Sequence, residues 1–325
     1  GEGARTTLRQ RLQSFFDTNG DGVLEEIVVP IGDARVKELR GEGFINHKWT
    51  LNSRLSLNSS LNFEYSKLTT SSAFNPGRTL KYPKPRLDAR YKTSKAGQLR
   101  LLIERTVSQL DFLNFVPSYN VLDDRIDAGN PGLLPERIWT AELGYEHRLA
   151  ADAGVIEGRL FYNDITDPID RYPLRQGGVF VSGQGNLAHA RRYGVEGKAS
   201  VRLVPIGLRD AVVTLRAMVQ NSRAIDPFTG QPRPIRSDAD YNLDIGFRHD
   251  VRALALAYGF DYKNVGSNRI QSDLFSLDLF RIAPMLEAFA ERRLTRSLLL
   301  RIEAQNILGG DEYRSRTQFL VNQMD

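Results

Sequence analysis

Residues 139–149 read WTAELGYEHRL, and this stretch decides the fold. Its odd positions carry apolar or aromatic side chains such as Trp139 and Leu143, while its even positions include Glu142, Glu146 and Arg148. Successive side chains of a β-strand point to opposite faces, so a period of two sets an apolar face against a charged one. The stretch therefore predicts a strand over 137–149.

The same alternation recurs along the chain. It is complete at 239–248 and weaker at 195–203, 213–220 and 298–305. In a chain that is 41% hydrophobic, a few alternating runs are expected by chance. The connections between the runs therefore carry more weight than any single run.

Short and long connections alternate between the predicted strands, and each short turn closes a hairpin. Three further strands are predicted upstream at 5–16, 35–51 and 55–69, which brings the total to about 13. The five clearest hairpins pair 79–92 with 98–111, 137–149 with 155–167, 189–204 with 211–222, 240–249 with 253–264, and 277–293 with 297–308.

Because short and long connections alternate, all the short turns lie at one end of the sheet and all the long loops at the other. Transmembrane β-barrels of outer membranes have this organisation, with short periplasmic turns and long extracellular loops. The predicted strands are long enough to cross an apolar band of ~25 Å. We therefore expect an all-β fold, a transmembrane antiparallel β-barrel, with residues 1–325 as one partial barrel domain.

The charged face favours a barrel rather than a soluble two-layer sheet. A two-layer sheet would bury this face in a dry core, and the free-energy cost of burying so many charges is too high. We expect this face to line a wet or plugged lumen. The residues predicted to line it are Glu104, Glu142, Glu146, Arg148, Arg159, Glu196, Lys198, Arg202, Asp244, Arg248, Arg301 and Glu303.

Composition excludes several other classes. The chain of 325 residues has no Cys and only 4 His, which removes disulfide scaffolds, thiolate metal sites and cysteine nucleophiles. No stretch approaches the ~18–20 apolar residues of a spanning helix. Net charge is +5, from 44 basic and 39 acidic residues with both signs interspersed, so nucleic acid is not an expected partner.

Aromatic residues near the predicted strand ends fit an interfacial girdle on the lipid-facing side. Ordinary β-propensity is the alternative explanation, because Tyr and Trp favour strands anywhere. The candidates are Trp49, Trp139, Tyr145, Tyr162, Tyr258 and Tyr262.

Several motifs carry a family resemblance. The segment 129–136, GNPGLLPE, is followed by AELGYE at 141–146 and LFYNDITD at 160–167. GNLA at 185–188, RYGVEG at 192–197 and IEAQNIL at 302–308 come next, in the same order. Together these patches resemble the barrel of TonB-dependent outer-membrane receptors.

The resemblance implies a receptor in the Gram-negative outer membrane that takes up a scarce nutrient: a siderophore, haem, cobalamin or an oligosaccharide. It implies no enzymatic activity. It also implies a plug filling a barrel of 22 strands, pulled by the TonB complex, with outer-membrane lipid and lipopolysaccharide around the wall. This sequence departs from that pattern, because it shows about 13 strands and no plug domain.

Loop residues supply the remaining candidates. Phe112, Phe115, Tyr172 and Phe180 lie in predicted long loops, where exposed aromatic side chains bind sugars or siderophores and equally pack one loop on another. Asp17, Asn19 and Asp21 match the first half of a calcium loop, but Val28 stands where the bidentate Glu belongs. A plain turn is the stronger interpretation there, and no other cofactor is expected.

Two other functions stay open at this point. One is a soluble or surface β-rich carbohydrate-binding protein, which would not depend on detergent. The other is a smaller outer-membrane barrel acting as an adhesin or hydrolase, although no nucleophile and base can be recognised. The sequence does not identify the transported substrate or the oligomeric state.

Overall fold

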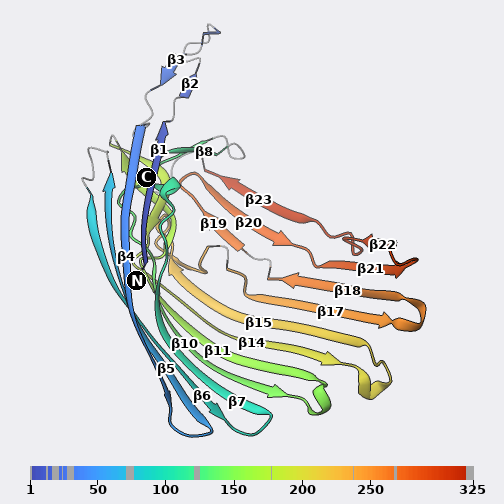
Figure 1. Cartoon of the computed structure of the whole chain (residues 1–325). Helices are drawn as coiled ribbons and strands as arrows, with labels where there is room; N and C mark the ends of the chain where they lie inside the picture. The colour runs from blue at the N-terminus through green and yellow to red at the C-terminus, as the bar shows by residue number, and fades with distance from the viewer. Residues whose placement is uncertain are drawn as a thin grey trace.

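A single broad antiparallel sheet dominates the molecule and curves into an open trough (Figure 1). The computed structural model describes residues 2–11, 14–16, 22–23, 25–27, 33–70, 77–120, 125–176, 178–236, 238–266 and 269–319. Within these residues the main sheet has 14 strands, and no helix is long and apolar enough to cross a membrane.

Neighbours in the main sheet follow the chain order, so each strand pairs with the next by a hairpin or a loop. Its consecutive strands are β1 (Glu2–Arg11), β4 (Asp33–Thr50), β5 (Leu55–Thr70), β6 (Arg78–Lys92), β7 (Gly97–Val107), β10 (Arg137–Arg148), β11 (Gly154–Thr166), β14 (His189–Arg202), β15 (Ala211–Ile225), β17 (Tyr241–Val251), β18 (Leu256–Val265), β21 (Met285–Arg293) and β22 (Leu299–Ala304).

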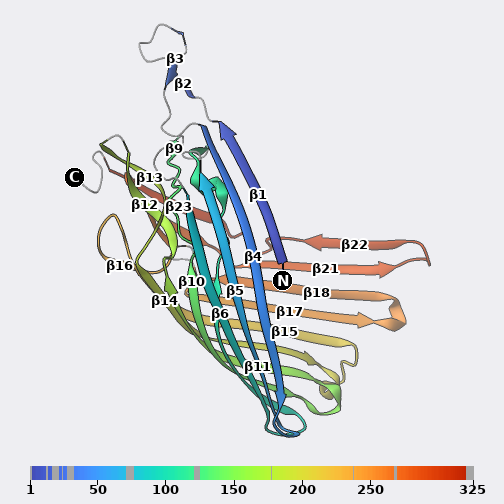
Figure 2. The same ribbon diagram turned by 60° about the vertical axis from the view of Figure 1, so that its left-hand side comes forward.

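The short turns lie together along one rim, as the sequence predicted (Figures 1 and 2). Local side chains shape them. Asn52 Oδ1 accepts from the backbone N–H groups of Arg54 and Leu55 at 2.8 and 2.9 Å, and Ser94 Oγ accepts from that of Gly97 at 2.8 Å. Short 3₁₀ turns fill three of the others, η2 (Ala150–Asp152), η3 (Val204–Ile206) and η4 (Arg252–Leu254).

The long loops gather at the opposite rim and carry small elements of their own (Figure 2). Apart from β2, which falls inside the strand predicted at 5–16, the sequence did not indicate these elements, because they are short and lack a clear period. They are β2 (Ser14–Phe16), β3 (Glu25–Ile27), η1 (Phe112–Phe115), β8 (Ser118–Asn120), β9 (Arg125–Asp127), β12 (Ile169–Gln176), β13 (Val179–Asn186), β16 (Pro232–Arg233) and β19 (Arg269–Ser272).

Two predicted strands are each divided in two. The strand predicted at 5–16 corresponds to β1 and β2, which belong to different sheets. The segment 277–293 forms β20 (Ser276–Ile282) and β21, separated at Ala283 and Pro284. Pro284 has no N–H to donate to a ladder, which explains a break at this point. β20 pairs with β23 (Glu312–Gln318) beyond the break, so the last hairpin extends further than predicted.

Apolar side chains cover the convex side of the sheet and remain exposed there. Leu143 is 44% exposed, and its cross-strand neighbours Leu101 and Leu160 are 39% and 57% exposed. Side chains of this kind outside any core indicate a surface that meets lipid. All the predicted girdle aromatics lie on this side by register, with Trp49 53% and Trp139 44% exposed.

Among the described residues, the compact apolar clusters lie at the long-loop end. One cluster joins the sheet residues Val36 and Leu68 to the loop residues Phe115 and Leu133. A second joins Ile165, Leu187, Ala190 and Ala224. These clusters fix the loops to the sheet and leave its middle hollowed and polar.

Candidate functional site

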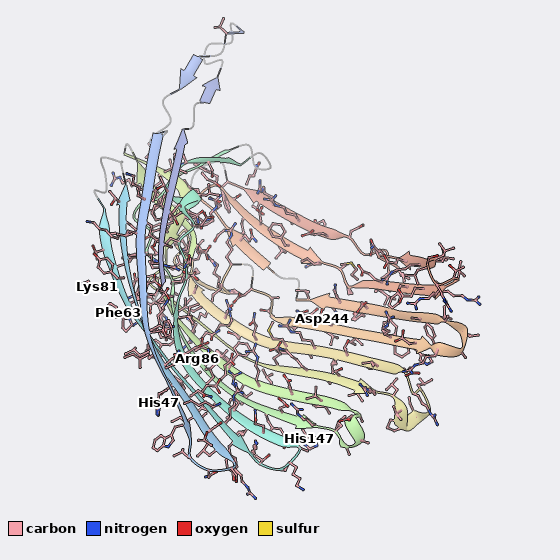
Figure 3. All side chains as sticks on the ribbon, in the orientation of Figure 1. His47, Phe63, Lys81, Arg86, His147 and Asp244 are labelled. Carbon is pink, nitrogen blue, oxygen red and sulfur yellow. The ribbon has the colours of Figure 1, made fainter. Side chains whose placement is uncertain are left out.

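The concave face of the sheet is the first candidate region. Strand register puts every residue predicted to line the lumen on this face, opposite the exposed apolar side chains. Figure 3 shows the contrast, with Phe63 on the convex side and Arg86 and Asp244 on the concave side. That these charges line a wet or plugged lumen stays a prediction.

Glu196 is the centre of the best-connected charge cluster on this wall. Its side chain is 1% exposed and accepts from Arg159 Nε at 2.5 Å and from Arg216 Nε at 2.6 Å. Arg159 also donates to Glu142, and Lys198 Nζ lies 3.8 Å from Glu196. A carboxylate that two guanidinium groups hold is a strong, directional contact, and it links three neighbouring strands.

The other predicted lumen residues are less buried. Glu104 pairs with Arg86, Glu146 with Arg148 at 3.0 Å, and Arg248 with Glu291 at 2.8 Å. Arg301 contacts Glu291 and Glu303. For Arg202 and Asp244, no ion pair occurs with the residues that the structure describes.

Two clusters on the same wall lay outside the predicted set. Asp88 accepts from Arg90 Nε at 3.0 Å and from Arg100 Nη2 at 2.6 Å. Lys84 Nζ donates to Glu64 at 2.9 Å and to Glu42 at 3.0 Å. The alternation of charges along 84–90 is the signal that could have indicated them from the sequence.

Aromatic rings of the concave face lie over glycines of the adjacent strand. Phe161 pairs in register with Gly194, where a Cβ would lie 2.8 Å from Phe161 Cζ and would clash with the backbone oxygen of Val219. The Arg159 guanidinium stands 5.3 Å from the centre of the Phe161 ring. Gly194 thus makes room for the Phe161 ring beside the Glu196 charge cluster.

Phe289 repeats the arrangement over Gly259, with Arg301 and Arg248 at 4.6 and 5.5 Å from the ring centre.

A buried ion network joins the long loops, and it is the second candidate region. Arg233 donates to Asp226 at 2.6 Å and to Asp170 at 2.8 Å, and Ser272 also donates to Asp226. The three charged side chains are 3–6% exposed. Removing one member of such a buried group leaves an uncompensated charge, so the contacts hold their loops together.

Arg171 extends this loop network. It donates to Asp127 at 2.6 Å, its Nε lies 3.3 Å from Asp273, and Ser182 donates to Asp273. Arg236 donates to the backbone oxygen of Ser272 at 3.0 Å. The loop network therefore spans the four long connections that follow β7, β11, β15 and β18.

The pKa values of two loop groups reflect this environment. Burial acts to raise the pKa of Asp226, but hydrogen bonds from Ser272, Arg233 and the backbone of Thr229 and Phe228 outweigh it and lower the pKa below 3.8. Burial lowers the pKa of Arg236. Asp226 is thus held ionised in the folded loops.

The four candidate aromatics are not brought to one place. Phe115 is 1% exposed in an apolar cluster, and Phe112 packs against it with ring centres 5.5 Å apart. Tyr172 packs against the second apolar cluster, whereas Phe180 is half-buried at the β12–β13 hairpin. Their role as ligand contacts stays a prediction.

The calcium prediction falls outside the described part of the chain, since Asp17, Asn19 and Asp21 are not among the described residues. Within the described residues, no group of three or more His, Asp or Glu side chains is arranged to hold a metal ion.

Comparison with known proteins identifies the class of protein. The family model for the TonB dependent receptor-like β-barrel matches residues 5–284. The chain therefore belongs to the TonB-dependent receptor family, whose members are β-barrels of the Gram-negative outer membrane. No curated protein sequence matches the chain.

Solved structures show the same fold at low identity. The copper transporter OprC aligns with a TM-score of 0.66 at 15% identity, over 94% of this chain and 46% of that one. The alcaligin receptor FauA from Bordetella pertussis aligns with a TM-score of 0.55 at 12% identity, over 89% of this chain and 46% of that one. The ferric-catecholate import receptor Fiu from E. coli K12 aligns with a TM-score of 0.59 at 12% identity, over 88% of this chain and 42% of that one. The chain spans less than half the length of each.

Proposed function

We propose that this chain is barrel wall of a receptor that imports a scarce nutrient across the outer membrane. The nutrient is a siderophore complex, haem, cobalamin or an oligosaccharide. The long loops capture it outside the cell, and it passes along the charged concave wall when a plug is displaced. The inner-membrane TonB complex supplies the energy through that plug, and no enzymatic step is involved.

The observation that carries this proposal is the pairing of a polar concave wall with a packed set of loops at its extracellular end. A wall of paired charges gives a hydrated solute a path without large apolar patches on which it would stall. The buried loop network gives the loops a defined shape, which a selective binding site requires.

The exposed convex face argues against the soluble carbohydrate-binding alternative. Leu143, Leu160 and Val195 form an apolar row across three strands with 44%, 57% and 48% exposure. In water this row would favour aggregation, whereas a bilayer makes it stabilising. No specific observation favours an adhesin or a hydrolase.

Among the loop aromatics, we propose Phe180 as the ligand contact. It is half-buried beside Val179, which is 63% exposed at the end of the same hairpin. Phe112, Phe115 and Tyr172 instead position the loops through the apolar clusters they contact.

Uptake into cells tests the function. The receptor is expressed in a strain without its own ferric-siderophore and cobalamin receptors, and entry of ⁵⁵Fe-siderophores, ⁵⁵Fe-haem, labelled cobalamin and labelled oligosaccharides is measured. We expect uptake of one class, abolished by a protonophore. Phe180→Ala should weaken cell-surface binding of that nutrient, whereas Leu113→Ala, at an exposed residue of η1, is the matched control. Absence of energy-dependent uptake for every class would refute the proposal.

A further inference from the structure

The four histidines of the chain all lie on the convex face, and three of them lie near the short-turn rim. His47 on β4, His147 on β10 and His249 on β17 are each within the last four residues of their strand, next to a short turn. Figure 3 shows His47 and His147 at this end of the sheet. The fourth, His189, begins β14 at the long-loop end. The positions of the first three define a histidine collar.

The collar coincides with the aromatic girdle of the short-turn side. The ring centres of His47 and Trp49 are 6.3 Å apart, and those of His147 and Tyr145 are 6.4 Å apart with the rings stacked. Aromatic girdles of outer-membrane barrels lie at the membrane–water interface. The imidazoles of the collar therefore lie at the level of the lipid headgroups.

His249 is the collar member with the most fixed orientation. It is directly opposite Tyr258 on β18, and its Nδ1 lies 3.0 Å from the phenolic oxygen. The two rings meet edge to face with their centres 5.4 Å apart. A hydrogen bond at Nδ1 holds the imidazole in place, so that Nε2 points to the other side of the ring.

The described residues supply no anion to the collar. None of its three histidines forms an ion pair with them, and Tyr145 and Tyr258 are the titratable groups that face it. On the convex face of the short-turn half, the described strands carry no Asp or Glu, and Arg292 is the one further charged residue. His189 differs, because its Nε2 lies 2.9 Å from Asp164. The residues directly opposite the collar are Ser59, Gly97, Ile156, Ala211 and Tyr258.

Chemistry and depth identify the anion that fits the collar. Histidine is the side chain that ordinarily gains or loses its charge between about pH 5 and pH 8. An imidazolium at the edge of an apolar band is partly removed from water, so a nearby anion stabilises it. The collar is on the face that meets lipid, and the anion present at that depth is the phosphate of a phospholipid headgroup.

We propose that the histidine collar binds the headgroups of anionic phospholipids in the periplasmic leaflet when its imidazoles are protonated. The neutral collar does not distinguish anionic from zwitterionic lipid by charge, so the preference for anionic lipid grows as the pH falls. The inference requires the convex face to meet lipid, but it does not depend on the nutrient carried or on what fills the lumen.

Lipid selectivity in vesicles tests the proposal. The full-length receptor is reconstituted in phosphatidylcholine vesicles with a trace of spin-labelled phosphatidylglycerol or spin-labelled phosphatidylcholine. Electron spin resonance then gives the association constant of each lipid at the protein surface. Phosphatidylglycerol stays ionised between pH 8 and pH 5.5, so a change in selectivity reports the protein. We expect the preference for phosphatidylglycerol to rise at least about twofold over this range, and less at high salt.

Substitutions assign the rise to the collar. The triple variant His47→Gln, His147→Gln, His249→Gln should lose most of it. His189→Gln is the matched control and should keep it, because His189 lies at the opposite rim and already has a carboxylate partner. The triple variant with arginine at the same three positions should prefer phosphatidylglycerol strongly already at pH 8, which a misfolded receptor would not do.

Four results would overturn the proposal. They are no rise in the parent, an equal rise for phosphatidylcholine, a rise that the glutamine substitutions leave unchanged, and a rise that His189→Gln alone removes. Nutrient uptake is measured separately, so any of these results leaves the proposed function standing.

Discussion

Arg159 on β11 donates to Glu196 on β14 across 2.5 Å, and Glu196 is almost completely buried by the cations around it. The described residues form no apolar cluster at the middle of the trough, so this contact stabilises the sheet there as core packing does elsewhere. It joins adjacent strands through their charged faces. Paired charges such as this one therefore help to hold the lumen wall, because their hydrogen bonds bridge neighbouring strands.

Glu196→Ala should destabilise the barrel by about 1–3 kcal/mol, because it leaves Arg159 and Arg216 without their shared acceptor. Partial exposure of both arginines keeps the loss at this level. Urea unfolding in micelles, followed by tryptophan fluorescence, measures it. Glu157→Ala is the matched control, since Glu157 is exposed on the same wall and forms no ion pair with a described residue; an equal loss there would contradict the account.

Acid should loosen the extracellular loops. The pKa of Asp226 is lowered in the folded loops, so its contribution to stability is complete above the ordinary value of 3.8 and is lost as the pH falls through the lowered pKa. Hydrogen exchange of residues 226–236 and 271–276, expressed as protection relative to the intrinsic exchange rate at each pH, should show less protection at pH 3 than at pH 7. Asp226→Asn should exchange faster already at pH 7 and depend less on pH. A variant with the same pH profile as the parent would exclude Asp226 as the responsible group.

Gly194 and Gly158 predict opposite outcomes for the same substitution. Gly194→Ala should cost about 1–3 kcal/mol, because the added methyl group meets the Phe161 ring and the backbone of Val219. Gly158→Ala should be neutral or slightly stabilising, since nothing lies within 4 Å of the added Cβ and alanine has less freedom to lose on folding. Thermal unfolding of the two variants in micelles decides between them, and similar Tm values would be inconsistent with the packing described.

The apolar row on the convex face predicts how arginine is tolerated. Leu143→Arg should destabilise the membrane-inserted barrel by about 2–4 kcal/mol, as expected for a charge near the bilayer midplane. Thr140→Arg, on the lumen face of the same strand and opposite Glu104, should be much milder. Folding into lipid vesicles, read from heat-modifiable gel migration, compares them. Equal effects would mean that the two faces are wrongly assigned.

The strand plan was predictable because it rests on local signals. Alternation around Trp139–Leu149 and the short turns at positions such as Asn52 define the hairpins without reference to the rest of the chain. Charges at even positions of β10 also placed Glu142 on the lumen face. The division of 277–293 was missed because Pro284 was not weighed as a break in the ladder.

The loop network was not predictable from the sequence. Asp170, Asp226 and Ser272 lie far apart in the chain, and no fixed spacing connects them to Arg233. They meet only because four loops fold over the same rim. The direct opposition of two carboxylates, Asp261 on β18 and Glu287 on β21, likewise depends on register, which no single strand specifies.

Accessibility along β10 tests the central claim most directly. The chain has no Cys, so a spin label on single cysteines at positions 139–146 reports one site at a time in a receptor reconstituted in lipid. The account predicts that odd positions collide preferentially with oxygen dissolved in the bilayer and even positions with a water-soluble nickel chelate. Odd positions more accessible to the chelate than even ones, or no alternation at all, would contradict a barrel wall with lipid outside and charge within.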